Sequence, residues 1–136
     1  MRYFTAAATD TAGNRVLLHS RGKLFVVEKG VDEPLGLALP HGSRAGAAAF
    51  SADGLSVFAV CDASGEEEIW RLSLNGPSER LTFDGNCQRT GLWPSPDGRW
   101  LAHADVERRL WLHDLEGANH RMLIDSPVGG DRKSVV

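Results

Sequence analysis

The chain has 136 residues, with 15 basic and 18 acidic side chains that give a formal net charge of −3 at neutral pH. The basic residues are scattered rather than gathered in a stripe, which argues against a nucleic-acid surface. No apolar stretch approaches the roughly 18 residues of a membrane span, and residues 1–14 lack the basic and apolar segments of a signal peptide. We therefore expect a soluble chain that binds neither nucleic acid nor membrane, in a compartment that the sequence leaves open.

The first predicted unit consists of two short strands between glycine turns. Gly13 precedes an apolar run from Arg15 to His19, and the pair Arg21-Gly22 marks a turn. A second apolar run from Leu24 to Val27 follows and ends before Gly30. Short apolar runs bounded by glycine are typical of β-strands. This unit is the least regular, because the residues just before Gly13 include neither the proline nor the aspartate of later turns.

The second unit repeats this order of turn, strand, loop and strand. Asp53-Gly54 precedes the strand Val57 to Val60, and a charged loop runs from Asp62 to Glu68. The strand Ile69 to Leu74 follows and leads into the turn Asn75-Gly76. The similarity to the first unit indicates a repeat.

The third unit is the clearest. Ser95-Pro96-Asp97-Gly98 is a turn, because Asp-Gly between apolar runs is a strong hairpin signal. The strands Trp100 to Ala104 and Leu110 to Leu115 follow, and Glu116-Gly117 closes the second of them. Pro94, which separates Trp93 from Ser95, predicts a bulge or an early end in the strand before the turn.

The three turn glycines set the period of the repeat. Gly13, Gly54 and Gly98 lie 41 and 44 residues apart. A period of this length with about four short strands is the signature of a propeller blade. Glu79 to Thr82 and Arg121 to Ile124 are expected as the outermost strands. The prediction is an all-β chain of three consecutive four-stranded blades, at about residues 5–46, 47–88 and 89–128.

Five motifs follow one another in a specific order. They are R-V-L-L-H-S-R-G-K-L-F-V-V (Arg15 to Val27), A-A-F-S-A-D-G (Ala48 to Gly54), C-D-A-S-G-E-E-E-I-W (Cys61 to Trp70), R-L-T (Arg80 to Thr82) and W-P-S-P-D-G-R-W-L-A (Trp93 to Ala102). This order, over residues 10–125, resembles the six-bladed propellers of TolB and of the tricorn-type serine peptidases. The resemblance implies that the chain is half of a six-bladed ring and a part of a longer protein.

The resemblance also implies a function. A tricorn-like peptidase would use this propeller to gate or dock peptide substrates, with its nucleophile in a separate C-terminal domain outside this chain. The alternative is a TolB-like scaffold that binds partner proteins and has no peptidase domain. A propeller of an oligopeptidase of the α/β-hydrolase type is a third alternative, and its fit to the R-G-x-L-F segment is weaker. In each case the expected partner is a peptide or a protein.

The residues themselves show no catalytic, cofactor or metal site. No G-x-S-x-G motif surrounds a serine, and Ser51 and Ser95 belong to turns. Glu66 to Glu68 is read as a solvated loop tip rather than an acid–base pair. The histidines lack metal-ligand spacing, and Cys61 and Cys87 are expected as free thiols. The five histidines are His19, His41, His103, His113 and His120.

Three aromatic residues occupy equivalent positions in equivalent strands. Phe25, Trp70 and Trp111 are each expected to pack between neighbouring blades rather than to form a ligand cage.

Three blades would leave two open apolar faces, which a soluble monomer does not tolerate well. We therefore expect a homodimer in which two copies, head to tail, complete a six-bladed ring. A domain swap through a long loop from Pro40 to Gly46, or aggregation, is the alternative.

Overall fold

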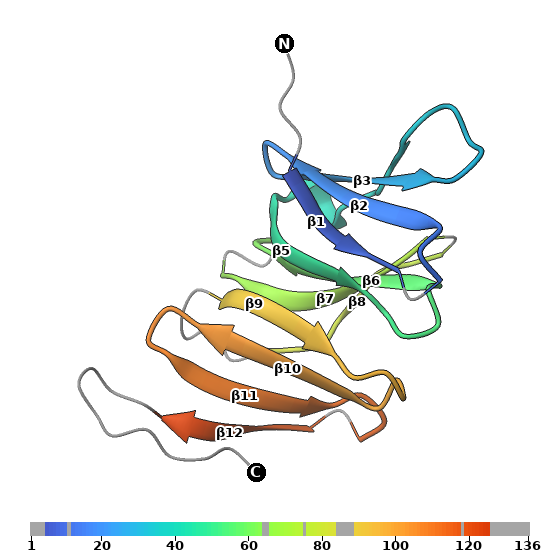
Figure 1. Ribbon diagram of the computed structural model, residues 1–136. Helices are drawn as coiled ribbons and strands as arrows, with labels where there is room; N and C mark the ends of the chain where they lie inside the picture. The colour runs from blue at the N-terminus through green and yellow to red at the C-terminus, as the bar shows by residue number, and fades with distance from the viewer. Residues whose placement is uncertain are drawn as a thin grey trace.

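The computed structural model describes residues 5–10, 12–63, 66–74, 76–83, 89–117 and 119–125. In these residues the chain forms three four-stranded antiparallel sheets, and the only helical segment among them is the short 3-10 turn η1 (Pro40–Gly42). The all-β prediction of three consecutive four-stranded blades is confirmed (Figure 1).

Each sheet is a meander in chain order, so each is one blade. The strands of the first sheet are β1 (Thr5–Thr9), β2 (Arg15–Ser20), β3 (Lys23–Glu28) and β4 (Leu35–Gly36). Those of the second sheet are β5 (Ala45–Phe50), β6 (Ser56–Cys61), β7 (Glu68–Ser73) and β8 (Glu79–Arg80). Those of the third sheet are β9 (Arg89–Pro94), β10 (Trp100–Asp105), β11 (Arg109–Asp114) and β12 (Asn119–Asp125).

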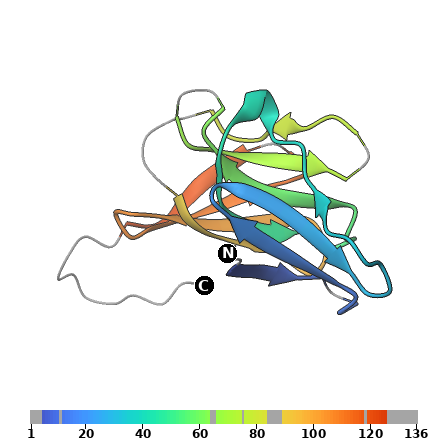
Figure 2. The same cartoon turned by 90° about the horizontal axis from the view of Figure 1, so that it is seen from above.

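The sheets pack face to face in chain order, as in a propeller. The first strands of successive sheets are neighbours, since β1 contacts β5 and β5 contacts β9. Figure 2 shows that the sheets fan out relative to one another. The order of blades seen in Figure 1, from β1–β4 to β9–β12, leaves one outward face at each end of the stack.

Apolar side chains fill both spaces between the sheets. Because side chains alternate along a strand, the middle sheet supplies one set of residues to each space. Leu17, Leu24 and Val26 of the first sheet meet Val57, Ala59 and Leu72 of the second in one cluster. In the other cluster, Phe58, Val60 and Ile69 of the second sheet meet Leu92 and Leu101 of the third. These two layers are the cores that hold the blades together.

The aromatic residues at equivalent positions behave differently. Trp70 packs against the cluster between the first and second sheets, as predicted. Trp111 lies opposite His103 and stacks on it, with ring centroids 6.1 Å apart and an interplanar angle of 2°. Phe25 alternates with Leu24 and Val26, so it lies on the outward face of the first sheet. Phe25 therefore faces away from the second blade, and its packing between two blades stays a prediction.

Glu68 is not a solvated loop residue as predicted. It is the first residue of β7, and its side chain is fully buried. Its carboxylate accepts a hydrogen bond from the Thr82 hydroxyl and pairs with the Arg80 guanidinium at 3.4 Å. A buried carboxylate is tolerated where such partners replace water. Glu66 does lie exposed in the loop before β7.

The strand before the third-blade turn carries the predicted irregularity, but not at Pro94. Pro94 is the last residue of β9 and pairs with Leu101, so the strand does not end early. The irregularity of β9 lies at its other end, where the register shifts between Ala104 and Asp105 of the partner strand. Proline is acceptable in β9 because this strand is the edge of its sheet.

The long loop predicted from Pro40 to Gly46 is mostly replaced by regular structure. Pro40 begins η1, and Ala45 and Gly46 already belong to β5. The turn residue Asn75 and the thiol of Cys87 lie outside the described residues, as do the side chains of His41 and His120. Cys61 is a free thiol that is buried in the apolar cluster between the first and second sheets, called the first cluster below.

Candidate binding cleft between two turns

The turns that open the second and third blades share one hydrogen-bond pattern. In the second blade, Oδ1 of Asp53 accepts the N–H of Leu55 at 2.9 Å and the hydroxyl of Ser51, and the Ser51 hydroxyl oxygen accepts the N–H of Ser56 at 3.1 Å. Gly54 follows at φ 75°, where glycine is favoured over residues with a β-carbon.

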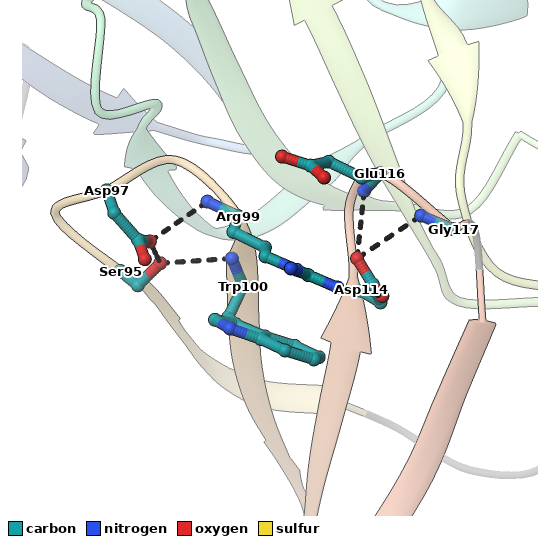
Figure 3. A network of polar contacts seen from close by, with 7 residues as sticks. All are labelled: Ser95, Asp97, Arg99, Trp100, Asp114, Glu116 and Gly117. Atoms are coloured by element: carbon teal, nitrogen blue, oxygen red, sulfur yellow. Dashed lines mark hydrogen bonds and ion pairs between the residues drawn. The ribbon is translucent and has the colours of Figure 1, made fainter.

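The third blade repeats the pattern with matching geometry. Oδ1 of Asp97 accepts the N–H of Arg99 at 3.0 Å, and the Ser95 hydroxyl oxygen accepts the N–H of Trp100 at 3.0 Å, as Figure 3 shows. Gly98 has φ 78°. Both predicted Asp-Gly turns are therefore present, and their serine hydroxyls serve the turns.

In the first blade one residue replaces both the serine and the aspartate. Oδ1 of Asp10 accepts the N–H of Asn14 at 2.9 Å and that of Arg15 at 3.0 Å, which are the counterparts of the two amides bound in the other turns. Gly13, at φ 76°, completes the turn. Sequence reasoning noted the missing aspartate before Gly13 but overlooked Asp10, three residues upstream.

The carboxylates of Asp53 and Asp97 are held ionised by their turns. Hydrogen bonds lower the pKa of Asp53 below its ordinary value. The bond from the Ser51 hydroxyl has the largest effect, and the bond from the N–H of Leu55 has the next largest. The Ser95 hydroxyl, followed by the N–H of Arg99, lowers the pKa of Asp97 in the same way. Both residues therefore carry negative charge at neutral pH.

Arg15 joins the turn edges of the first two blades. Its Nη1 donates to the carbonyl oxygen of Gly54 at 2.6 Å, so its side chain bridges from β2 to the next turn. The same strand position in the second blade, two residues after the turn glycine, holds Ser56. Serine is too short to cross to the third blade. Arg15 therefore bridges the space between the first and second blades at this edge. Ser56 does not bridge the corresponding space between the second and third blades.

A cleft of about 550 Å³ lies at that place. One side comes from the turn of the second blade and the other from the turn of the third, and residues of β6 and β7, the end of β9 and the turn after β11 complete the lining. Its lining residues are Ser51, Ala52, Asp53, Ser56, Phe58, Arg71, Pro94, Pro96, Asp97, Gly98, Leu115 and Glu116.

The lining combines apolar surface with unequal charge. Phe58 is buried, and the guanidinium of Arg71 lies over its ring at 5.6 Å from the centroid. Arg71 also pairs with the exposed Glu79 at 3.4 Å. The lining contains three carboxylates, those of Asp53, Asp97 and Glu116, and one cationic side chain, that of Arg71. The charged residues of the lining are therefore net acidic, and its accessible apolar surface comes from Pro94, Pro96 and Leu115.

A polar network holds the third-blade side of the cleft in place. The Arg99 guanidinium lies over the Trp100 ring and pairs with Oδ2 of Asp114 at 3.4 Å. Oδ1 of Asp114 accepts the N–H groups of Glu116 and Gly117 at 3.0 and 3.2 Å (Figure 3). Desolvation acts to raise the pKa of Asp114, but the N–H groups of Gly117 and Glu116 outweigh it and the pKa is lowered. The network fixes the backbone beside Glu116.

The remaining residues singled out from the sequence do not converge on a second site. His19 contacts the carbonyl oxygen of Ala45 at 2.7 Å across the first interface, and His103 and His113 are buried in the third sheet. Within the described ranges no group of three or more His, Cys, Asp or Glu side chains could hold a metal ion. A search of those same residues finds no helix with the length and apolar character to cross a membrane.

No protein-family model matches this sequence, and no curated protein matches it significantly. Solved structures do match its fold. A TolB-type protein from Agrobacterium tumefaciens superposes with a TM-score of 0.79 and 20% identity over 92% of this chain. TolB from Acinetobacter baumannii superposes with a TM-score of 0.72 and 17% identity over 91% of this chain. The chain spans 50% of the first structure and 34% of the second. The fold is that of part of a TolB-like β-propeller.

Proposed function

We propose that this chain is a non-catalytic propeller module that binds a peptide segment of a partner protein in the cleft between its second and third blades. The observation that carries the proposal is the cleft itself, which lies at the interface where Ser56 takes the place of Arg15. Clefts that combine apolar surface with a few fixed polar groups are typical ligand sites.

The lining predicts the chemistry of the bound segment. Asp53 and Asp97 are ionised and fixed by their turns, so they attract a lysine or arginine side chain without reorganising. Pro94, Pro96 and Leu115 offer apolar surface beside that charge. A segment with a basic side chain next to an apolar one is complementary to both parts.

Two kinds of parent protein fit such a module, and both are proposals. A TolB-like scaffold is supported by the fold shared with the TolB structures. The propeller of a tricorn-like serine peptidase is supported by the order of the five sequence motifs, and peptide docking would then feed a catalytic domain outside this chain. In both cases the chain itself performs no hydrolysis.

Fluorescence anisotropy with two short labelled peptides tests the proposal. The peptides Gly-Leu-Lys-Leu-Gly and Gly-Leu-Glu-Leu-Gly differ only in the charge of the central residue. We expect the lysine peptide to bind the purified chain at least tenfold more tightly. Equal binding of both peptides, or binding of neither, overturns the proposed chemistry.

Ser56→Arg provides a variant that fills the cleft by the means the chain already uses at Arg15. It should abolish binding of the lysine peptide while the thermal unfolding temperature is kept. Thr90→Arg, at an exposed position outside the cleft lining, is the matched control and should leave binding unchanged. Incubation with a fluorophosphonate should label no serine, and stoichiometric labelling would contradict the non-catalytic assignment.

A further inference from the structure

Each end of the stack of sheets presents an apolar face. On the first sheet, Val16, Leu18 and Val27 alternate with the buried residues Leu17 and Val26, so they lie on the side away from the second sheet. We call this the first open face. All three side chains are only partly buried.

The third sheet has the corresponding outer side. Ala102, Leu110 and Leu112 alternate with Leu101 and His113, which are buried, and they lie away from the second sheet. We call this the last open face. Trp93, on the same side of β9, is 56% exposed. An exposed tryptophan beside half-buried leucines marks an interaction surface.

The interface between the first two sheets shows what covers such faces. There, Leu24 and Val26 of β3 meet Val57, Ala59 and Leu72 of the second sheet in one buried cluster. Matching the pairing registers places Leu110 and Leu112 of β11 at the positions of Leu24 and Val26. The last open face therefore corresponds to the side of a blade on which the next blade packs.

The first open face corresponds to the opposite side of a blade, the side that packs on the preceding blade. By the same registers, Val16, Leu18 and Val27 occupy the positions of Val57, Ala59 and Leu72. None of these positions on either open face holds a charged residue. The first open face is thus built to pack on a last open face.

The two faces of one chain cannot meet, because the second sheet lies between them (Figure 1). A second copy offers both faces at once. The chain also spans 50% of the TolB-type structure that it matches, so two copies supply one full propeller of that size.

We propose that two copies of this chain close a six-bladed ring, with the first open face of each packed on the last open face of the other. Both apolar faces are then removed from water in two equivalent interfaces.

Light scattering and sedimentation velocity of the purified 136-residue chain test the proposal. We expect a single species of twice the 14.8 kDa chain mass. A monomer at micromolar concentration overturns the proposal, and so does a broad distribution of larger species, because neither closes the ring.

Charged substitutions then test which faces meet. Val27→Lys and Leu112→Glu should each give monomers. In a ring of two copies, either substitution places one charge in each of the two interfaces. Val106→Glu, which changes a residue 51% exposed in a hairpin loop, is the control and should remain dimeric. If Val27→Lys gives monomers while Leu112→Glu stays dimeric, like faces pair with like and the ring is excluded.

Mixing the two monomeric variants provides the sharpest outcome. A mixed dimer has one unaltered interface and one in which the introduced lysine of one copy would face the introduced glutamate of the other, so dimers should return. Circular dichroism of each variant separates a lost interface from a lost fold. Failure of folded variants to recombine overturns the face-to-face pairing.

Discussion

The indole Nε1–H of Trp111 donates a hydrogen bond to Oδ2 of Asp105 at 3.1 Å, across the hairpin between β10 and β11. The same carboxylate accepts the N–H groups of Glu107 and Arg109 at 2.9 and 3.0 Å, and it pairs with the Arg109 guanidinium at 2.9 Å. Asp105 is 3% exposed. One buried carboxylate therefore joins the hairpin loop to an aromatic side chain in the third blade.

Asp105→Ala should lower the free energy of unfolding by about 2–4 kcal/mol, because it leaves several donors without their acceptor. Glu107→Ala is the matched control in the same loop. Glu107 is exposed and 3.7 Å from Arg109, so its loss should cost less than about 0.5 kcal/mol. Chemical denaturation measures both changes, and similar costs would contradict the role given to Asp105.

Gly54→Ala should destabilise the protein by about 1–2 kcal/mol, since an L-residue is strained at φ 75°. Crowding does not contribute much, because the nearest atom to an added β-carbon would be Arg15 Nη1 at 3.8 Å. Gly46→Ala, at an ordinary φ with open space around it, is the control. It should be neutral or slightly stabilising in thermal unfolding, and equal shifts for both variants would exclude a conformational cause.

Acid should weaken the turns of the second and third blades. The pKa values of Asp53 and Asp97 are lower in the folded chain than their ordinary value of 3.8. Their contribution is thus complete above that value and is lost as the pH falls through the lower folded pKa values. Unfolding temperatures measured from about pH 6 to pH 2.5 should fall less steeply for Asp53→Asn/Asp97→Asn, which keeps an acceptor but does not titrate. An unchanged slope would contradict the assignment.

Cys61 should be inert in the folded protein. Burial raises the pKa of its thiol to about 12, so the reactive thiolate is scarce near neutral pH. In a Cys87→Ser background, a disulfide reagent at about pH 8 should modify Cys61 slowly in the native state and at once in guanidinium chloride. Rapid native labelling would show that the first cluster opens readily.

The architecture could be predicted from the sequence because its signals are local. The turn glycines at 13, 54 and 98 and the apolar runs after them determine strands and turns within a few residues of each other. The outer strands were harder, since β4 is only Leu35–Gly36 and β8 only Glu79–Arg80. Strands this short have almost no periodicity to detect.

The candidate site could not be predicted, because it depends on how equivalent positions differ between blades. Nothing local distinguishes Ser56 as the residue that leaves a cleft until Arg15 is seen to bridge the corresponding space. The burial of Glu68 was missed for a similar reason. Its partners Arg80 and Thr82 lie 12 and 14 residues away, and only the pairing of β7 with β8 brings them near.

The first two blades are joined by backbone as well as by side chains. The N–H of Ala45, at the start of β5, donates to the carbonyl oxygen of Gly22 in the first-blade hairpin at 2.8 Å. That amide is sheltered only while the hairpin rests on the second sheet. The exchange of its hydrogen with deuterium therefore measures, at a single atom, how often the first blade lifts away from its neighbour.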